Sequence, residues 1–373
     1  MYPKVQFQLT VHSLTSSALS KLDQLVKNFT RKWLKIPSST TFDHIAHPQG
    51  MNIRLPTLLY DHGHIISESI PSDEIVEAAI QESSDESTTH RTSYRQHILT
   101  DNRKANVKNL MSRSSKDLED HAATLTLQGE WKYLFALQCN ETSFRALAMG
   151  LSESTYRFLL QAMTNTAPTM SYLRTINANV SAACPKCHQS PETLLHALNN
   201  CKVSQETGLF TWRHNEVLKH LSRSLREEYC DTWEVRCDLP GEEANDTIPQ
   251  HILVTPLKPD AVIFNRDKRA INLIELTICW DTNFNNAEAR KTNRYQELEA
   301  ELSERNWKVN LITLEIGSRG FTSNQTASKL KILFPRKSTR KNIIQELNRR
   351  ALAASHCIFM HRKDTNWSPA SFL

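Results

Sequence analysis

Two short apolar runs near the end of the chain each have an acidic residue where a buried sheet would normally have none. The first run, residues 261–264, follows the dipeptide Pro259-Asp260, and the second, residues 271–279, contains Glu275. A charged segment, residues 266–269, separates them, and two apolar runs joined by a polar turn predict a β-hairpin. The hairpin would place Asp260 and Glu275 on neighbouring strands of one small sheet.

An acidic side chain inside an apolar strand is costly to bury unless it has a partner. A shared Mg²⁺ or Mn²⁺ is a natural partner, because hard cations prefer carboxylate oxygens. Residues 285–306 have helical composition and carry Lys291 and Tyr295 four residues apart, on one helix face. Two carboxylates, a lysine and a metal suit phosphodiester hydrolysis, in which the metal activates water and the lysine stabilises developing charge. Alternatively, Pro-Asp marks a turn, Glu275 faces solvent and Tyr295 is a core aromatic.

A second candidate metal site lies in the segment CPKCHQSPETLLHALNNC. Cys184, Cys187, His196 and Cys201 follow one another with two, eight and four intervening residues. A Cys-x-x-Cys turn presents two thiolates, and three thiolates with one imidazole form a closed tetrahedral site typical of structural Zn²⁺. The alternatives are free thiols with a core histidine, or His188 as the fourth ligand in place of His196.

Charge and cysteine content narrow the class of protein. The net charge is +5 and the isoelectric point about 8.7, which is only mildly basic, so local clusters matter more than the total. Residues 1–36 hold six basic residues against one acidic residue, and this segment includes Lys32 and Lys35. We expect these two lysines to contact a nucleic-acid backbone. Eight cysteines without a secretory leader favour reduced thiols or a metal, in the nucleus or cytosol.

The spacing of apolar residues along the rest of the chain predicts a mainly helical first half and a second half that combines helices and strands. Alternating apolar residues predict a strand within residues 1–13, and helical spacing predicts a helix from Thr15, capped by Ser16 or Ser17, to Pro37. Residues 38–61 are expected to be loop with short helical turns, residues 81–93 a flexible linker, and residues 231–250 an acidic loop. Further helices are expected at 125–160, with an interruption near 139–142, and at 209–229, 321–334 and 338–360, with a strand at 309–316. No apolar run approaches the ~20 residues that a membrane span needs.

The order helix, strand, strand, helix, strand resembles the αβββαβ core of the PD-(D/E)xK restriction-like nucleases, with one strand less certain. The resemblance extends to the C-terminal region of site-specific non-LTR retrotransposon proteins, the elements that insert into ribosomal RNA genes. It is carried by the Cys/His segment, Arg213-His214-Asn215, Pro259-Asp260, and Lys291 with Tyr295. FQLTVHSL, RKWLKIP and GMNIRLP, within residues 1–60, resemble the reverse transcriptase thumb. Residues 125–180 resemble the helical linker that precedes the zinc knuckle.

The resemblance implies a domain plan and a fold class. The fold class is α+β, with a mainly helical N-terminal half, a zinc knuckle and a restriction-like endonuclease core. Residues 1–80 would be a partial thumb, 81–101 a flexible linker, 102–180 a helical linker domain, 181–205 the CCHC knuckle and 206–373 the endonuclease.

The resemblance also implies a mechanism, in which the endonuclease nicks one strand of target DNA and the freed 3′ hydroxyl primes reverse transcription. The catalytic carboxylates would be Asp260 and Glu275, the second of which is commonly aspartate in this family. Restriction enzymes usually place the lysine at the position of Thr277, whereas in this family it comes from the following helix, as Lys291 does, with Tyr295 beside it. Arg213 and His214 match a basic pair that we expect to contact DNA.

The absence of a Tyr-x-Asp-Asp pattern limits the expected activity. We find no palm or fingers sequence, so this chain is expected to be a truncated frame or a fragment that cannot polymerise DNA alone. The expected partners are target DNA and, in the full-length protein, element RNA, with nuclear localisation and no membrane. The alternative function is a non-catalytic nucleic-acid-binding remnant of the same element.

Overall fold

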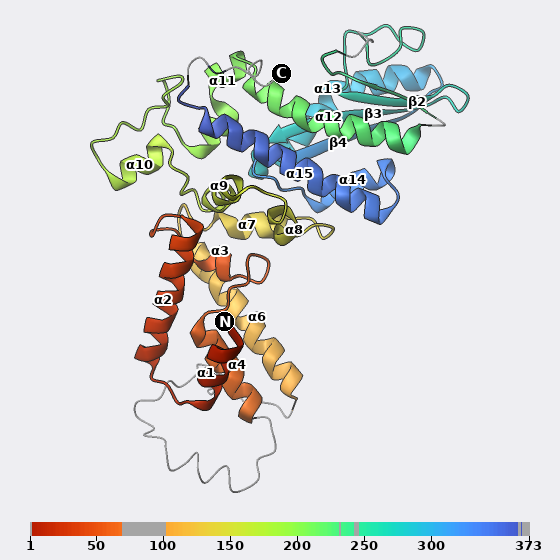
Figure 1. Cartoon of the computed structure of the whole chain (residues 1–373). Helices are drawn as coiled ribbons and strands as arrows, with labels where there is room; N and C mark the ends of the chain where they lie inside the picture. Colours follow the sequence, from red (N-terminus) through yellow and green to blue (C-terminus); the bar gives the residue numbers. More distant parts are fainter. Residues whose placement is uncertain (1, 69–101, 231–232, 242–245, 365–366, 368–373) are drawn as a thin grey trace. The chain divides into compact units, whose positions relative to one another are not determined.

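The computed structural model describes residues 2–68, 102–230, 233–241, 246–364 and 367. The chain divides into two compact units, Met1–Lys132 and Tyr133–Leu373 (Figure 1). The second unit combines helices with a four-stranded sheet, so the α+β class is confirmed. The predicted linker at 81–101 lies outside the described residues. Within the described ranges, no helix is long and apolar enough to cross a membrane.

The first unit is helical where it is described. Its helices are α1 (Tyr2–Val11), α2 (Ser16–Leu34), α3 (Asp43–Ala46), α4 (Pro56–Glu68) and α6 (Arg103–Thr124). A further helix, α7 (Glu130–Leu137), spans the boundary between the units. The helix predicted from Thr15 is confirmed, and its cap is Thr15, whose hydroxyl accepts the N–H of Ala18 at 3.2 Å. Residues 38–61 contain α3 and the beginning of α4, which starts at a proline, as helices often do.

The strand predicted within residues 1–13 is wrong, because this segment forms α1. The alternation gave a strand pattern, but a strand needs a partner for its backbone groups, and the described part of this unit contains no strand. Leu9 is 3% exposed and belongs to a small core with Leu19, Leu59 and Tyr60. One face of α1 therefore packs into this core, while Phe7 on the same helix is exposed.

The helices of the second unit before the sheet are mostly short. They are α8 (Phe144–Ala148), α9 (Glu153–Met163), α10 (Met170–Ile176), the π-helix η1 (His196–Asn200), α11 (Lys202–Glu206) and the long α12 (Leu209–Tyr229). The helix predicted over 209–229 is thus confirmed. The predicted helical run over 125–160 is confirmed as α7, α8 and α9, with breaks between them.

The sheet contains the strands β1 (Glu234–Cys237), β2 (Ala261–Asn265), β3 (Ala270–Cys279) and β4 (Lys308–Gly317), in spatial order β1-β2-β3-β4. The predicted hairpin is confirmed, because β2 and β3 pair antiparallel. β1 adds to β2 antiparallel, where the sequence was expected to be an acidic loop. β1 has only four residues and little burial. Its sequence therefore contains no apolar run from which a strand could be predicted. The predicted strand at 309–316 is confirmed as β4, which pairs parallel to β3.

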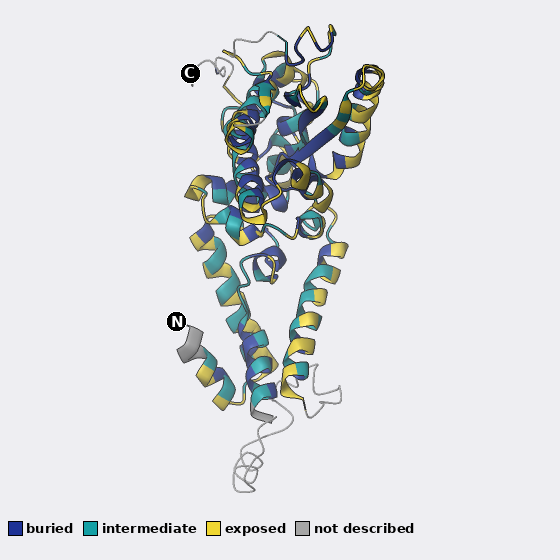
Figure 2. Cartoon of the chain, turned by 90° about the vertical axis from the view of Figure 1, so that its right-hand side faces the viewer, coloured by how far each residue is buried: buried dark blue, intermediate teal, exposed yellow. Residues whose placement is uncertain are grey.

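Helices cover both faces of this sheet (Figure 1). The connection between β3 and β4 contains the 3-10 turn η2 (Asp281–Asn283) and α13 (Phe284–Glu304), which packs on one face through Tyr295 and two leucines. The other face packs against α12, α14 (Asn324–Leu333) and α15 (Lys337–Met360). The strands between these layers are largely buried (Figure 2). From α12 to β4 the order of the major elements is helix, three strands, helix, strand.

Candidate functional site

The two carboxylates predicted to share a cation lie together at the end of the hairpin. Asp260 is the residue before β2, and Glu275 is in the middle of β3. The backbone N–H of Asp260 donates to Glu275 Oε2 at 3.3 Å. The backbone N–H of Leu276 donates to Asp260 Oδ2 at 2.7 Å. The strand pairing itself therefore positions both side chains.

The crossover helix α13 brings two further predicted residues to the carboxylates. Lys291 Nζ forms an ion pair with Glu275 Oε1, and the two side chains are 17% and 2% exposed. Tyr295, one turn later, is fully buried and donates its hydroxyl to the carbonyl of Lys258 at 3.0 Å. Asp260, Glu275, Lys291 and Tyr295 thus converge, and Tyr295 belongs to the core as well.

The electrostatics of this cluster leave negative charge only partly compensated. Burial raises the pKa of Glu275, the neighbouring carboxylate of Asp260 raises it further, and Lys291 opposes both without cancelling them. Burial and the nearby Glu275 also raise the pKa of Tyr295, so its hydroxyl stays protonated and can donate a hydrogen bond. A divalent cation would relieve the repulsion between two close carboxylates. The donor atoms present therefore fit Mg²⁺ or Mn²⁺.

The neighbouring residues Arg213 and His214 face different partners. Arg213 is 1% exposed and donates from Nη1 to Ser355 Oγ on α15 at 3.1 Å. The expected contact with DNA is therefore not available to Arg213, because its guanidinium lies inside the protein; burial lowers its pKa to about 10. His214 Nε2 lies 3.2 Å from Asp260 Oδ2. Burial lowers the pKa of His214, but the charge and hydrogen bond of Asp260, together with the hydrogen bonds to Asn215 and Leu276, outweigh burial, so the net pKa is raised.

The two lysines expected to contact nucleic acid belong to the first unit. Lys32 lies in the last turn of α2 and is exposed. Lys35 is the C-cap of that helix, also exposed, in the left-handed conformation with φ of 53°. Both residues are thus exposed to solvent.

A second carboxylate–lysine cluster on the same sheet face was missed from the sequence. Lys329 Nζ lies 3.1 Å from Glu315 Oε2 on β4 and 2.8 Å from Glu288 Oε1 on α13. Glu315 is 2% exposed. The available signal was the one that revealed Glu275, since Glu315 also interrupts an apolar strand. Alternation along β4 places Glu315 and Thr313, which accepts from Lys329 at 2.6 Å, on one face.

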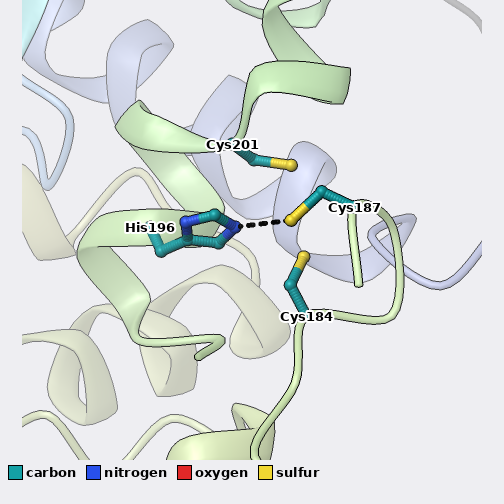
Figure 3. A group of neighbouring side chains, drawn as sticks. All are labelled: Cys184, Cys187, His196 and Cys201. Carbon is teal, nitrogen blue, oxygen red and sulfur yellow. Dashed lines mark hydrogen bonds between the residues drawn. The ribbon is translucent and has the colours of Figure 1, made fainter. Parts of the chain in front are cut away.

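The four predicted zinc ligands also come together. The ligand atoms of Cys184, Cys187, His196 and Cys201 all lie within 4.8 Å of one another, and their side chains point toward a common centre (Figure 3). His196 Nε2 is 3.4 Å from Cys187 Sγ. His188 is not a member of this group, so the alternative fourth ligand is wrong. The Cys₃His set can bind zinc.

Local backbone structure explains how the ligands meet. The N–H of Cys184 donates to the carbonyl of Ser190 at 2.8 Å, and the N–H of His188 donates to the carbonyl of Cys184 at 2.9 Å. These bonds close the tight turn that presents Cys184 and Cys187. His196 begins η1, and Cys201 is the N-cap of α11. Burial raises the pKa of the Cys184 thiol, which favours the protonated thiol when no cation is bound.

A buried ion pair fixes this segment to the end of α15. Glu192 is fully buried; its Oε2 accepts the N–H of Met170 at 2.7 Å, and its Oε1 lies 3.1 Å from Arg362 Nε. Arg362 lies two residues after the last residue of α15, and its guanidinium lies over the ring of Phe359, 3.9 Å from the centroid. The Cys/His segment is thus held to the same helix that contacts Arg213.

A comparison with protein-family models and with curated proteins finds no match to this chain.

Proposed function

We propose that the second unit is a metal-dependent DNA endonuclease that nicks a target strand, similar to the restriction-like endonuclease of site-specific non-LTR retrotransposons. The observation that carries this proposal is the convergence of Asp260, Glu275 and Lys291 at one end of the hairpin. These side chains come from a strand terminus, a strand interior and a crossover helix. A sheet needs no such cluster for its stability, because a buried charged group is seldom better than an apolar one.

Each residue has a defined role in the proposal. Asp260 and Glu275 hold Mg²⁺ or Mn²⁺ through carboxylate oxygens. When bound, the cation polarises the scissile phosphate and lowers the pKa of a coordinated water. Lys291 exchanges its partner Glu275 for a phosphate oxygen and supplies fixed positive charge. Tyr295 holds the strand that leads to Asp260 through the carbonyl of Lys258.

The Cys₃His group has a structural role in the proposal. Cys184, Cys187, His196 and Cys201 would hold one Zn²⁺ with no ligand position left open, as in structural zinc sites. The expected partners are target DNA and, in a longer protein, the RNA of the element, and the compartment is nuclear. A second candidate function, nucleic-acid binding without catalysis, is favoured by one observation: Lys291 already pairs with Glu275, as in a purely structural ion pair.

Nicking of supercoiled plasmid separates the two candidates. Asp260→Asn keeps the shape of the side chain and removes its charge, so the endonuclease reading expects nicking in Mg²⁺ or Mn²⁺ to fall at least about 100-fold, the scale for removing an electrostatic group at a reacting centre. Asp267→Asn is the matched control, because Asp267 is an exposed acid in the turn of the same hairpin. DNA affinity without divalent cation should be unchanged in both variants, since binding depends on phosphate contacts elsewhere.

Equal nicking rates for Asp260→Asn and the parent would refute the catalytic assignment. A parent protein that binds DNA but does not nick it in either metal would favour the binding remnant.

A further inference from the structure

We propose that His214 is a positioning residue that fixes the orientation of the metal-binding carboxylate of Asp260, rather than a contact to DNA. This inference rests on the proposed function and specifies how the carboxylate of Asp260 is oriented for the cation. It reassigns a residue that the sequence placed in a basic DNA-binding pair.

The geometry around Asp260 is asymmetric. Its Oδ2 accepts the backbone N–H of Leu276 at 2.7 Å and lies 3.2 Å from His214 Nε2. Both of these contacts fall on Oδ2. A carboxylate with one oxygen held by two donors has its plane fixed and presents the other oxygen, here Oδ1, for a cation. Partners of this kind around metal-binding carboxylates orient the ligand and raise its affinity.

The other polar neighbours of the imidazole are oxygen atoms. His214 Nε2 also lies 3.2 Å from the carbonyl oxygen of Leu276 on β3, so it is shared between this oxygen and Asp260 Oδ2. His214 Nδ1 lies 3.1 Å from the side-chain oxygen of Asn215. A carbonyl oxygen can only accept, so the Nε2 position must carry a proton to satisfy this environment. His214 therefore acts toward Asp260 as a hydrogen-bond donor.

The helix that carries His214 is anchored by the preceding residue. Arg213 points inward to Ser355 on α15, and α12 packs along α15 (Figure 1). Consecutive residues on a helix point about 100° apart, so fixing Arg213 against α15 directs His214 toward β3. The tripeptide Arg213-His214-Asn215 thus acts as an internal support of the carboxylate, in which only His214 touches Asp260.

A positioning role and a DNA-contact role predict opposite results. Loss of a positioning donor weakens binding of the cation and leaves DNA affinity unchanged. Loss of a DNA contact weakens DNA binding and leaves the cation untouched. The side chains of His214 and Asp260 are 22% and 15% exposed, so both lie largely inside the protein.

The test measures Mn²⁺ binding to the full zinc-loaded chain by isothermal titration calorimetry, with Asp260→Asn defining the signal of the carboxylate site. For His214→Leu we expect the Kd for Mn²⁺ to rise 10- to 100-fold, the range for lost partners of metal ligands. DNA affinity measured without divalent cation should stay within about 2-fold of the parent, a change of less than 1 kcal/mol. His220→Leu is the control, because His220 lies on the same helix and contributes nothing to the cluster around Asp260.

Two conservative variants keep the test decisive if His214→Leu does not fold. The amide nitrogen of glutamine reaches about as far as Nε2, whereas that of asparagine reaches only about as far as Nδ1. His214→Gln should therefore restore most of the Mn²⁺ affinity, and His214→Asn should not. Equal Mn²⁺ affinities for the parent, His214→Gln and His214→Asn would overturn the inference, as would a loss of DNA affinity with Mn²⁺ binding intact.

The failure of this inference and of the proposed function give different results. If Asp260→Asn abolishes nicking while His214→Asn binds Mn²⁺ like the parent, only the role of His214 is refuted. If the parent shows no Mn²⁺ binding that depends on Asp260, the proposed function falls, and the inference falls with it.

Discussion

Replacing Lys291 with methionine tests whether the carboxylate–lysine cluster is arranged for chemistry at the cost of stability. The substitution keeps an unbranched side chain that is one atom shorter and removes its charge. Glu275 then stays 2% exposed beside the carboxylate of Asp260, with the N–H of Asp260 as a donor but no cation. Removing one partner of a buried ion pair typically costs about 3–5 kcal/mol, because the remaining charge is uncompensated.

Glu275 can avoid that cost by binding a proton, so the loss must depend on pH. Burial and Asp260 already raise the pKa of Glu275 in the folded protein. The folded state therefore binds this proton more tightly than the unfolded state, and stability falls as the pH rises above the unfolded pKa. The slope reaches at most about 1.4 kcal/mol per pH unit, and it ends once the pH passes the folded pKa. Without Lys291 the folded pKa rises further, so the loss continues to higher pH.

We therefore expect Lys291→Met to be nearly as stable as the parent near pH 5.5 and roughly 3 kcal/mol less stable near pH 8.5, the lower part of the range for a broken buried pair. Urea unfolding with zinc in excess and no Mg²⁺ or Mn²⁺ measures this difference. Glu275→Gln combined with Lys291→Met should remove this additional pH dependence, because neither titratable member of the pair is then present. Lys331→Met, at an exposed lysine of α14, is the control.

The same variant should also nick DNA about 10²- to 10³-fold more slowly, the scale for one lost stabiliser of transition-state charge. A stability loss equal at both pH values would refute the reasoning about Glu275. A parental nicking rate for Lys291→Met would remove Lys291 from the chemistry.

Two further predictions concern other parts of the chain. The purified parent should contain one equivalent of zinc by elemental analysis, and Cys187→Ser should contain less than half an equivalent, since a Cys₃His site needs all four ligands; equal zinc contents would contradict the site. In the first unit, burial lowers the pKa of His44 to about 3, so this histidine folds uncharged and its contribution to stability is lost as the pH falls from about 6.5 toward 3. Circular dichroism during acid titration should show His44→Phe to be less acid-sensitive than the parent.

The parts of the fold that the sequence predicted are those in which local pattern and tertiary environment agree. β2 and β3 are largely apolar because both of their faces are covered, and α12 has apolar residues at helical spacing. α1 was mistaken for a strand because alternation over a few residues fits either structure, and only the available partner decides. β1 was missed for the opposite reason. Its four residues form a strand because they pair with β2, although their own composition does not favour a strand.

The residues of the candidate site could be predicted where a charged side chain lies within an otherwise apolar segment. Glu275 interrupts an apolar strand, and that contradiction identified it. Arg213 and His214 could not be assigned from charge alone, since a basic pair suits DNA equally well. The helical spacing could have shown that Arg213 is buried. Arg213 lies four residues before Val217 and eight before Leu221, and both of these are fully buried. Arg213 therefore shares the buried face of α12, and His214 lies about 100° away.

The zinc-binding segment and the carboxylates are connected through one helix, α15. Glu192, within the Cys/His segment, pairs with Arg362 at the end of α15, and Ser355 on α15 accepts from Arg213 on α12. Because His214 follows Arg213, the position of α15 influences the donor that faces Asp260. The segment around the proposed zinc ligands is too short to hold its shape by a core of its own, so we expect metal binding to supply its folding free energy. Loss of zinc should therefore loosen the end of α15, and we expect Cys187→Ser to bind Mn²⁺ more weakly than the parent, although no zinc ligand belongs to the carboxylate cluster.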